Sequence, residues 1–220
     1  MRTGYLITAV LVPALLFAQV RQGPRLGLAV ATQTAGQFLQ WQGLPKFGPI
    51  VGWSWDIPYT YQVHILVEPM LMSKGSWTRN NQLNQNTFIT QRYIDLPVLA
   101  KLELDTAQNG TYLSGGVVYG YWIYYKRVDK QDGQVLYEQV YDLNQPNVRR
   151  SQWSVALGLG RNGKRMGWEL RAQTSVTPFD RLIRSQNLVF GLHLTYRLLT
   201  YEERKAKRDA KRDPEEENTE

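Results

Sequence analysis

The stretch that decides the fold runs from Leu188 to Leu198 and reads LVFGLHLTYRL. Successive side chains of a strand point to opposite faces of a sheet, so both faces can be read from these letters. One face is apolar throughout: Leu188, Phe190, Leu192, Leu194, Tyr196 and Leu198. The other carries Val189, Gly191, His193, Thr195 and Arg197. This pattern is typical of a strand between lipid and the interior of a barrel, and a tilted strand needs roughly 9–11 residues to cross the hydrocarbon core.

The same alternation recurs along the chain and predicts further strands. Together with the last one they are expected near residues 24–32, 48–57, 62–72, 92–104, 111–126, 150–160, 165–175 and 187–198. Most of them separate apolar from polar or small residues cleanly, whereas 48–57 and 111–126 carry bulky residues on both faces. The smallest common membrane barrel has eight strands. We therefore expect an all-β protein, an eight-stranded antiparallel up-and-down transmembrane β-barrel.

The connections between these strands alternate in length. Long ones are expected at residues 33–47, 73–91, 127–149 and 176–186, and short turns at 58–61, 105–110 and 161–164. Membrane barrels place short turns in the periplasm and long loops outside the cell, so this order fits the fold. Within 127–149, Asp132-Gly133 is a favoured hairpin pair, which leaves open a strand extension above the membrane or a flexible loop.

Aromatic residues on the lipid-facing side are expected at both rims, because their apolar rings and polar tips suit the membrane interface. The outer rim is predicted to hold Tyr121, Tyr125 and Trp153. The periplasmic rim is predicted to hold Trp55, Trp168 and Tyr196.

The two ends of the chain differ from the barrel between them. Residues 1–18 have a basic start, a short apolar stretch and a Leu-Phe-Ala end, which indicates a cleaved signal peptide, and the stretch is too short for a membrane-spanning helix. Residues 19–200 then form the barrel. Residues 201–220 mix acidic and basic side chains, and we expect a solvated periplasmic tail that is disordered or partly helical, with a handle for a partner as the alternative.

Composition excludes several classes. The formal net charge is +7, but the basic residues form no stripe, so nucleic acid is not an expected partner. The sequence has no cysteine, which excludes both a lipoprotein attachment site and a disulfide framework.

The inward faces of the predicted strands carry charge. We expect a polar network inside the barrel that comprises Arg25, Glu68, Asp95, Lys101, Glu103, Glu169, Arg171, His193 and Arg197. An eight-stranded barrel is only wide enough for side chains to fill it. Mutual pairing of these charges is therefore favoured over a charged pore or proton path.

No motif in the sequence predicts a catalytic, cofactor or metal site. The stretch 158–163 fits a dinucleotide fingerprint, but another strand follows it where a helix is required, so we expect a periplasmic hairpin. His64 and His193 both face inward without an evident serine partner, so we expect no catalytic role for either. Neither cysteine nor a histidine spacing for metal ligands is present.

The stretch Arg92-Tyr93-Ile94-Asp95-Leu96-Pro97-Val98-Leu99-Ala100-Lys101 is similar to the aromatic-acid-Pro-Leu-Lys strand of a known family. The sequence resembles the PorT-like outer-membrane β-barrel proteins of Bacteroidetes, with looser matches at 68–75, 158–160 and 168–171. The resemblance covers about residues 24–198 and implies an outer-membrane location without enzymatic activity. Some relatives take part in type IX secretion, but most have no assigned role, so that process is not transferred. The charged tail departs from barrels that end at their last strand.

The sequence thus predicts a monomeric, non-enzymatic outer-membrane barrel in a bacterial cell envelope. It would act as a structural or binding component through the loops 73–91 and 127–149 or the tail 201–220, in contact with outer-membrane lipid and an envelope protein. The alternatives are a narrow channel or transporter for small solutes, a secreted lipocalin-like binder, and an outer-membrane hydrolase.

Overall fold

A computed structural model describes residues 20–35, 40–41, 44–80, 84–104, 110–144, 148–179 and 185–198. The expected signal peptide at 1–18 and the tail at 201–220 lie outside these residues. Within the described ranges, the chain has no helix that is long and apolar enough to span a bilayer.

The described chain consists of antiparallel strands in one sheet. They are β1 (Arg21–Ala35), β2 (Gln40–Trp41), β3 (Leu44–Pro58), β4 (Val63–Val67), β5 (Met70–Asn80), β6 (Gln85–Glu103), β7 (Thr111–Gln131), β8 (Gln134–Val140), β9 (Ser151–Asn162), β10 (Met166–Ser175) and β11 (Gln186–Tyr196). Neighbours in sequence are neighbours in space, as in an up-and-down barrel.

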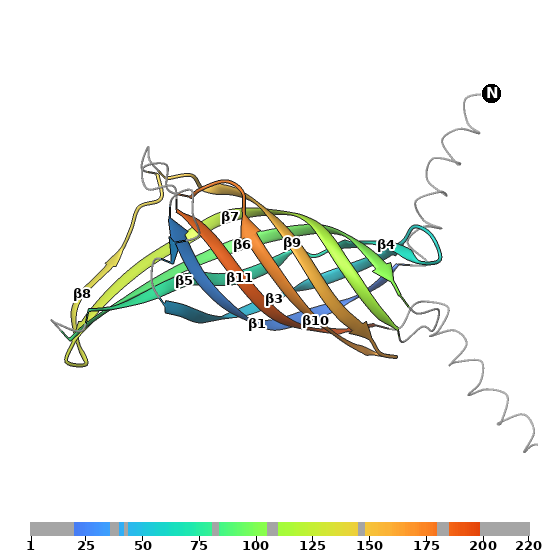
Figure 1. The fold of residues 1–220 in the computed structure, drawn as a ribbon, viewed down its shortest axis with the longest axis horizontal. Coiled ribbons are helices and arrows are strands. Elements are labelled where there is room, and N and C mark those ends of the chain that lie inside the picture. Colours follow the sequence, from blue (N-terminus) through green and yellow to red (C-terminus); the bar gives the residue numbers. More distant parts are fainter. Residues whose placement is uncertain are drawn as a thin grey trace, which may run out of the picture.

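Pairing of the first and last long strands closes the barrel (Figure 1). β1 pairs with β11 from Arg25↔Thr195 to Thr34↔Gln186, and on its other side it pairs with β3. When β4 and β5 are counted as one interrupted strand, eight strands form the closed ring. The predicted eight-stranded barrel is confirmed.

The predicted strand 62–72 is interrupted where the sequence reads Glu68-Pro69. β4 ends at Val67 and β5 begins at Met70. Proline has no N–H to donate to a sheet ladder, so regular pairing stops there. The Pro69 carbonyl still accepts a hydrogen bond from the Trp53 N–H at 3.0 Å, and the Glu68 N–H donates to the Pro97 carbonyl at 3.1 Å. The break leaves the direction of the strand unchanged.

Beyond the ring, β5, β6, β7 and β8 continue as a sheet, which we call the outer extension; it leaves the barrel at the left of Figure 1. The long connections expected at 73–91 and 127–149 are therefore largely paired strand; for 127–149 this is the strand extension that the Asp132-Gly133 pair offered as one of two alternatives. Alternation of apolar and polar residues is weak there because a sheet in water needs no lipid-facing side. Asp132 and Gly133 have positive φ angles of 51° and 84°, which suits the tight turn between β7 and β8.

A β-bulge in β7 changes which side chains face the barrel mouth. Trp122 pairs with Tyr93 and Tyr124 pairs with Arg92, so Ile123 is an extra residue. An extra residue reverses the alternation beyond it. Tyr125 consequently turns inward and contacts Trp122, and its predicted place in the outer aromatic girdle is wrong. Tyr121 and Trp153 remain exposed near that rim.

The barrel is mainly polar inside and apolar outside, which is the reverse of a soluble domain. Alternate apolar residues are exposed along each strand, as in Leu28, Leu170 and Leu192, while Arg25 and Glu169 are buried. Small apolar clusters also fill parts of the lumen; one consists of Leu66, Leu99, Val118 and Ala156. The exposed apolar band is the surface that lipid would cover.

Replacement of a lipid-facing residue tests this orientation. We expect Leu192→Arg to lower the free energy of unfolding by ~2–4 kcal/mol in a lipid bilayer, because the charge enters the hydrocarbon. Val135→Arg in the outer extension should change it by less than ~0.5 kcal/mol. Urea unfolding in vesicles measures both, and equal effects would contradict the assignment of the lipid-facing band.

Candidate functional site

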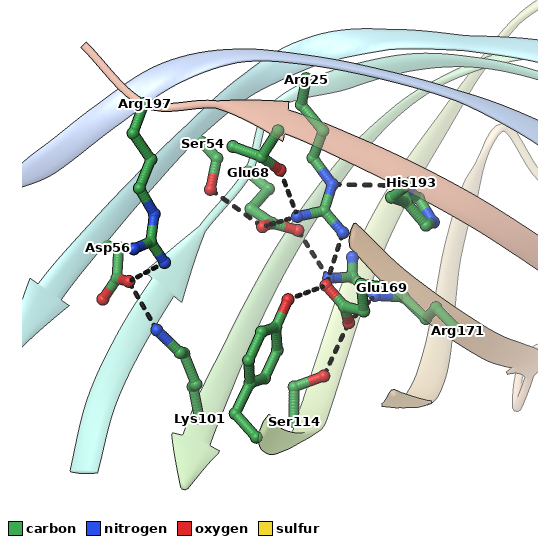
Figure 2. A network of polar contacts seen from close by, with 12 residues as sticks. Arg25, Ser54, Asp56, Glu68, Lys101, Ser114, Glu169, Arg171, His193 and Arg197 are labelled. Atoms are coloured by element: carbon green, nitrogen blue, oxygen red, sulfur yellow. Dashed lines mark hydrogen bonds and ion pairs between the residues drawn. The ribbon is translucent and has the colours of Figure 1, made fainter. Parts of the chain in front are cut away.

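The interior of the barrel is filled by charged side chains that pair across it. At its centre lie Arg25, Glu68, Glu169, Arg171 and His193, which we call the central cluster (Figure 2). They come from β1, the β4–β5 break, β10 and β11, and each points into the lumen because its neighbours in sequence face lipid. All five are at least 96% buried.

Two arginines and two glutamates alternate in the central cluster. The Arg25 guanidinium contacts Glu68 Oε1 at 2.7 Å and Glu169 Oε2 at 2.5 Å. Arg171 Nη2 contacts Glu68 Oε2 at 2.7 Å and Glu169 Oε2 at 2.9 Å. Each carboxylate therefore bridges both guanidinium groups, and the four charges cancel. Such multiple pairing offsets the cost of removing charges from water.

Neutral groups complete this arrangement. Ser54 Oγ donates to Glu68 Oε1 at 3.0 Å, and Ser114 Oγ donates to Glu169 Oε1 at 2.7 Å. A Cβ at Gly158 would lie 2.2 Å from Glu169 Oε1, so glycine at this position lets the carboxylate lie close to the backbone of β9. Arg25 Nε donates to His193 Nδ1 at 3.1 Å. A ring nitrogen that accepts carries no proton, so His193 is neutral in this geometry.

A second group, the turn-end cluster, lies at the end of the barrel that carries the short turns. It consists of Asp56, His64, Lys101, Glu103 and Arg197. Lys101 Nζ lies 2.7 Å from Asp56 Oδ2 and 2.9 Å from Glu103 Oε1. His64 Nδ1 lies 2.6 Å from Asp56 Oδ1, while its Nε2 faces Glu103 at 3.8 Å. The imidazole thus sits between two carboxylates.

A third group lies toward the outer extension. Lys74 Nζ contacts Asp95 Oδ2 at 2.7 Å and lies 4.3 Å from the centre of the Tyr93 ring. Gln173 Nε2 donates to Asp95 Oδ2 at 3.2 Å, and Asn187 Nδ2 donates to the Tyr93 hydroxyl at 3.3 Å. Here a single buried ion pair is supported by amides and a ring.

All nine residues expected in the interior network lie within the described part of the chain and make contacts in these groups. Glu103 and Arg197 are the more exposed members, at 13% and 14% of their side-chain surface. Sequence reasoning missed Asp56 and Lys74. Asp56 lies in a strand with bulky residues on both faces, and Lys74 lies in a stretch expected to be a loop.

Little empty space remains among these groups. A cavity of about 20 Å³ near the turn-end cluster is lined by Asp56, Lys101 and Arg197, among others. That is room for about one water molecule. Within the described residues, no group of three or more His, Cys, Asp or Glu side chains is arranged to hold a metal ion.

Ion pairs also lie on the outer extension. Lys126 Nζ contacts Glu138 Oε1 at 2.6 Å across β7 and β8, and Arg127 Nη2 contacts Asp129 Oδ2 at 3.0 Å. Burial raises the pKa of the Asp129 carboxyl, but hydrogen bonds from Arg127 and Thr87 and the charge of Arg127 outweigh it and lower that pKa. Asp129 therefore stays ionised next to Arg127.

The family match agrees with this architecture. Residues 17–181 match the family model described as an outer membrane protein beta-barrel domain. No protein with a curated description matches the sequence. Among solved structures, Ail of Yersinia pestis in complex with the heparin analogue sucrose octasulfate is 10% identical, with 81% of this chain and 99% of that chain covered and a TM-score of 0.48. Neisserial surface protein A is 10% identical, with coverages of 80% and 96% and a TM-score of 0.48.

The central cluster can be tested by unbalancing its charges. We expect Arg25→Met to lower the free energy of unfolding by ~3–5 kcal/mol, because two buried glutamates then share one arginine. Adding Glu68→Gln should recover part of that loss by restoring neutrality. Arg161→Met, at an exposed position of β9, is the control and should have an effect below ~0.5 kcal/mol. A double variant as unstable as the single one would contradict charge balance as the cause.

Proposed function

The chain belongs to the outer membrane protein β-barrel domain family, and on this premise we propose that it is a non-enzymatic binding component whose outer extension holds a partner protein. The protein is located in the outer membrane, where the barrel is a rigid scaffold and function commonly resides in what protrudes from it. The observation that supports the proposal is the open edge of β8.

Within the described part of the chain, β8 is paired on one side only. It pairs with β7 from Lys126↔Val140 to Gln131↔Gln134, and all seven of its residues are exposed. Val135, Leu136 and Val140 are each more than half exposed, on an edge without proline or lysine. Soluble sheets usually protect such an edge with these residues. Its free N–H and C=O groups therefore suit an added strand.

The occupant we propose is an extended segment of another protein. A second copy in the same membrane does not suit this edge, because antiparallel pairing of two β8 strands requires a two-fold axis perpendicular to the sheet. The outer extension continues the barrel wall, so such an axis would turn one barrel upside down (Figure 1). We accordingly propose a monomeric barrel, in contact with outer-membrane lipid, that pairs with a foreign strand.

The interior network is assigned a structural role in this proposal. Paired charges and a cavity of about 20 Å³ leave no space for a solute, which argues against a channel. His193 Nδ1 accepts from Arg25, and His64 Nε2 faces the Glu103 carboxylate, where an esterase-type base would face its nucleophile, which argues against such a base. The apolar band on the outside argues against a secreted lipocalin-like binder.

Three further assignments are proposed from sequence. The strand at 92–101 supports membership of the PorT-like barrels of Bacteroidetes. Residues 1–18 are proposed to be a signal peptide that is removed before assembly. Residues 201–220 are proposed to be a solvated periplasmic tail. Amino-terminal sequencing of the mature protein should begin at Gln19. Deletion of 201–220 should leave the barrel folded.

The β8 edge is tested by site-specific crosslinking in intact cells. A photoreactive residue at Leu136 should give a discrete adduct, and Val135→Lys with Val140→Lys should abolish it, because lysines block an edge. Thr78, exposed on β5 at the opposite edge, is the matched position for both the probe and a Thr78→Lys control. Amide exchange of β8 should slow when the adducted partner is added. Equal adducts at Leu136 and Thr78 would count against the edge.

Planar-bilayer recordings test the filled lumen. The purified barrel should show no reproducible open state, because the paired charges occupy its cross-section. A steady conductance that disappears on replacing Arg25 or Lys101 would establish the channel instead.

A further inference from the structure

A second feature of the outer end is an aromatic-lined hollow in the barrel mouth, apart from the β8 edge. Its volume is about 230 Å³. We call it the mouth pocket, and it is lined by Trp122, Tyr125, Tyr141, Asp142, Leu143, Val148 and Phe179. Pockets for drug-sized ligands start at about 300 Å³, so this one suits a headgroup-sized molecule.

Three segments distant in sequence build the mouth pocket. The bulge at Ile123 turns Tyr125 toward Trp122, and the chain after β8 adds Tyr141. Phe179, which follows β10, is fixed by backbone hydrogen bonds: its N–H donates to the Ser185 carbonyl at 3.0 Å, and its carbonyl accepts from the Arg149 N–H at 2.9 Å. The pocket is therefore built from residues that backbone and ring contacts hold in place at the outer end of the barrel.

The rings of the pocket are set at angles to one another. Trp122 lies 5.3 Å from Tyr125 at 57° and 5.5 Å from Phe179 at 74°, measured between ring centres and planes. Tyr125 lies 4.7 Å from Tyr141 at 31°. Trp122 and Phe179 are buried, whereas Tyr125 and Tyr141 are half-buried. Rings inclined in this way surround the hollow from several directions.

Among the described residues, one charged side chain lines the pocket. It belongs to Asp142, which is exposed at the rim. The guanidinium of the nearby Arg150 donates to the Trp122 carbonyl at 3.4 Å and to Asn144 Oδ1 at 3.3 Å, and it lies 4.9 Å from the centre of the Tyr121 ring. A ligand in the hollow thus meets aromatic rings and one carboxylate.

We propose that the mouth pocket binds an organic cation of the alkylated ammonium class. The faces of aromatic rings attract cations, most strongly where water is excluded, and a carboxylate at the rim adds a charge of opposite sign. A purely apolar ligand would gain nothing from Asp142. This site is separate from the β8 edge, so either proposal can fail without the other.

The test uses the full barrel in a non-ionic detergent, titrated with choline and with 3,3-dimethylbutanol by calorimetry. The two probes have the same shape, but the second replaces the charged nitrogen with carbon. We expect saturable choline binding and ~5- to 30-fold weaker binding of the neutral probe, since a cation–π contact contributes about 1–2 kcal/mol. Equal affinities, or no saturable binding at millimolar choline, would overturn the proposal.

Variants locate the binding in the mouth pocket. Asp142→Asn and Tyr141→Leu should each weaken choline binding several-fold. Binding of the neutral probe should be less affected by Asp142→Asn, because this probe has no charge to pair with the carboxylate. Asp132→Asn, at the turn between β7 and β8, removes a charge outside the pocket and should leave affinity unchanged. Retention of the folded form on unheated gels controls for structure. Wild-type affinity in the Asp142 variant would exclude the carboxylate as a recognition element.

Discussion

The structure depends on the pairing of β1 with β11. Without it, two strands would present unpaired N–H and C=O groups to hydrocarbon, where no water can satisfy them. Their register, Arg25↔Thr195 through Thr34↔Gln186, also places Arg25 beside His193 and so determines which polar side chains meet inside. The pairing that closes the sheet therefore also brings residues of the central cluster together.

Closure creates a narrow lumen, and the chain fills it with charge. Lipid covers the apolar side of each strand, so cohesion has to come from the side that faces inward. Arg25 and Arg171 against Glu68 and Glu169 provide it at the centre, with separate groups around Lys101 and Lys74 toward the two ends. Each group balances its charges locally, which explains how so many ionised side chains can be buried.

The outer end departs from the regular barrel in two ways, and both arise from β7. The strand runs past the ring to Gln131 and supports β8, whose free edge faces water. The bulge at Ile123 reverses its alternation and brings Tyr125 over the lumen, where the mouth pocket forms. Both proposed binding sites thus depend on the continuation of the barrel wall by β7.

The sequence by itself determined the eight strands, their lipid-facing sides and the short turns at one end, because alternation with a period of two is a local property. It also placed Arg25, Glu169 and His193 on the inward side. It did not reveal the bulge at Ile123 or the strand within 73–91, and it left the strand extension within 127–149 as one of two alternatives, because a sheet in water needs no apolar face. Only the tertiary structure decided that Lys74 pairs with Asp95 and Asp56 with Lys101, because those contacts join different strands whose register the letters do not state.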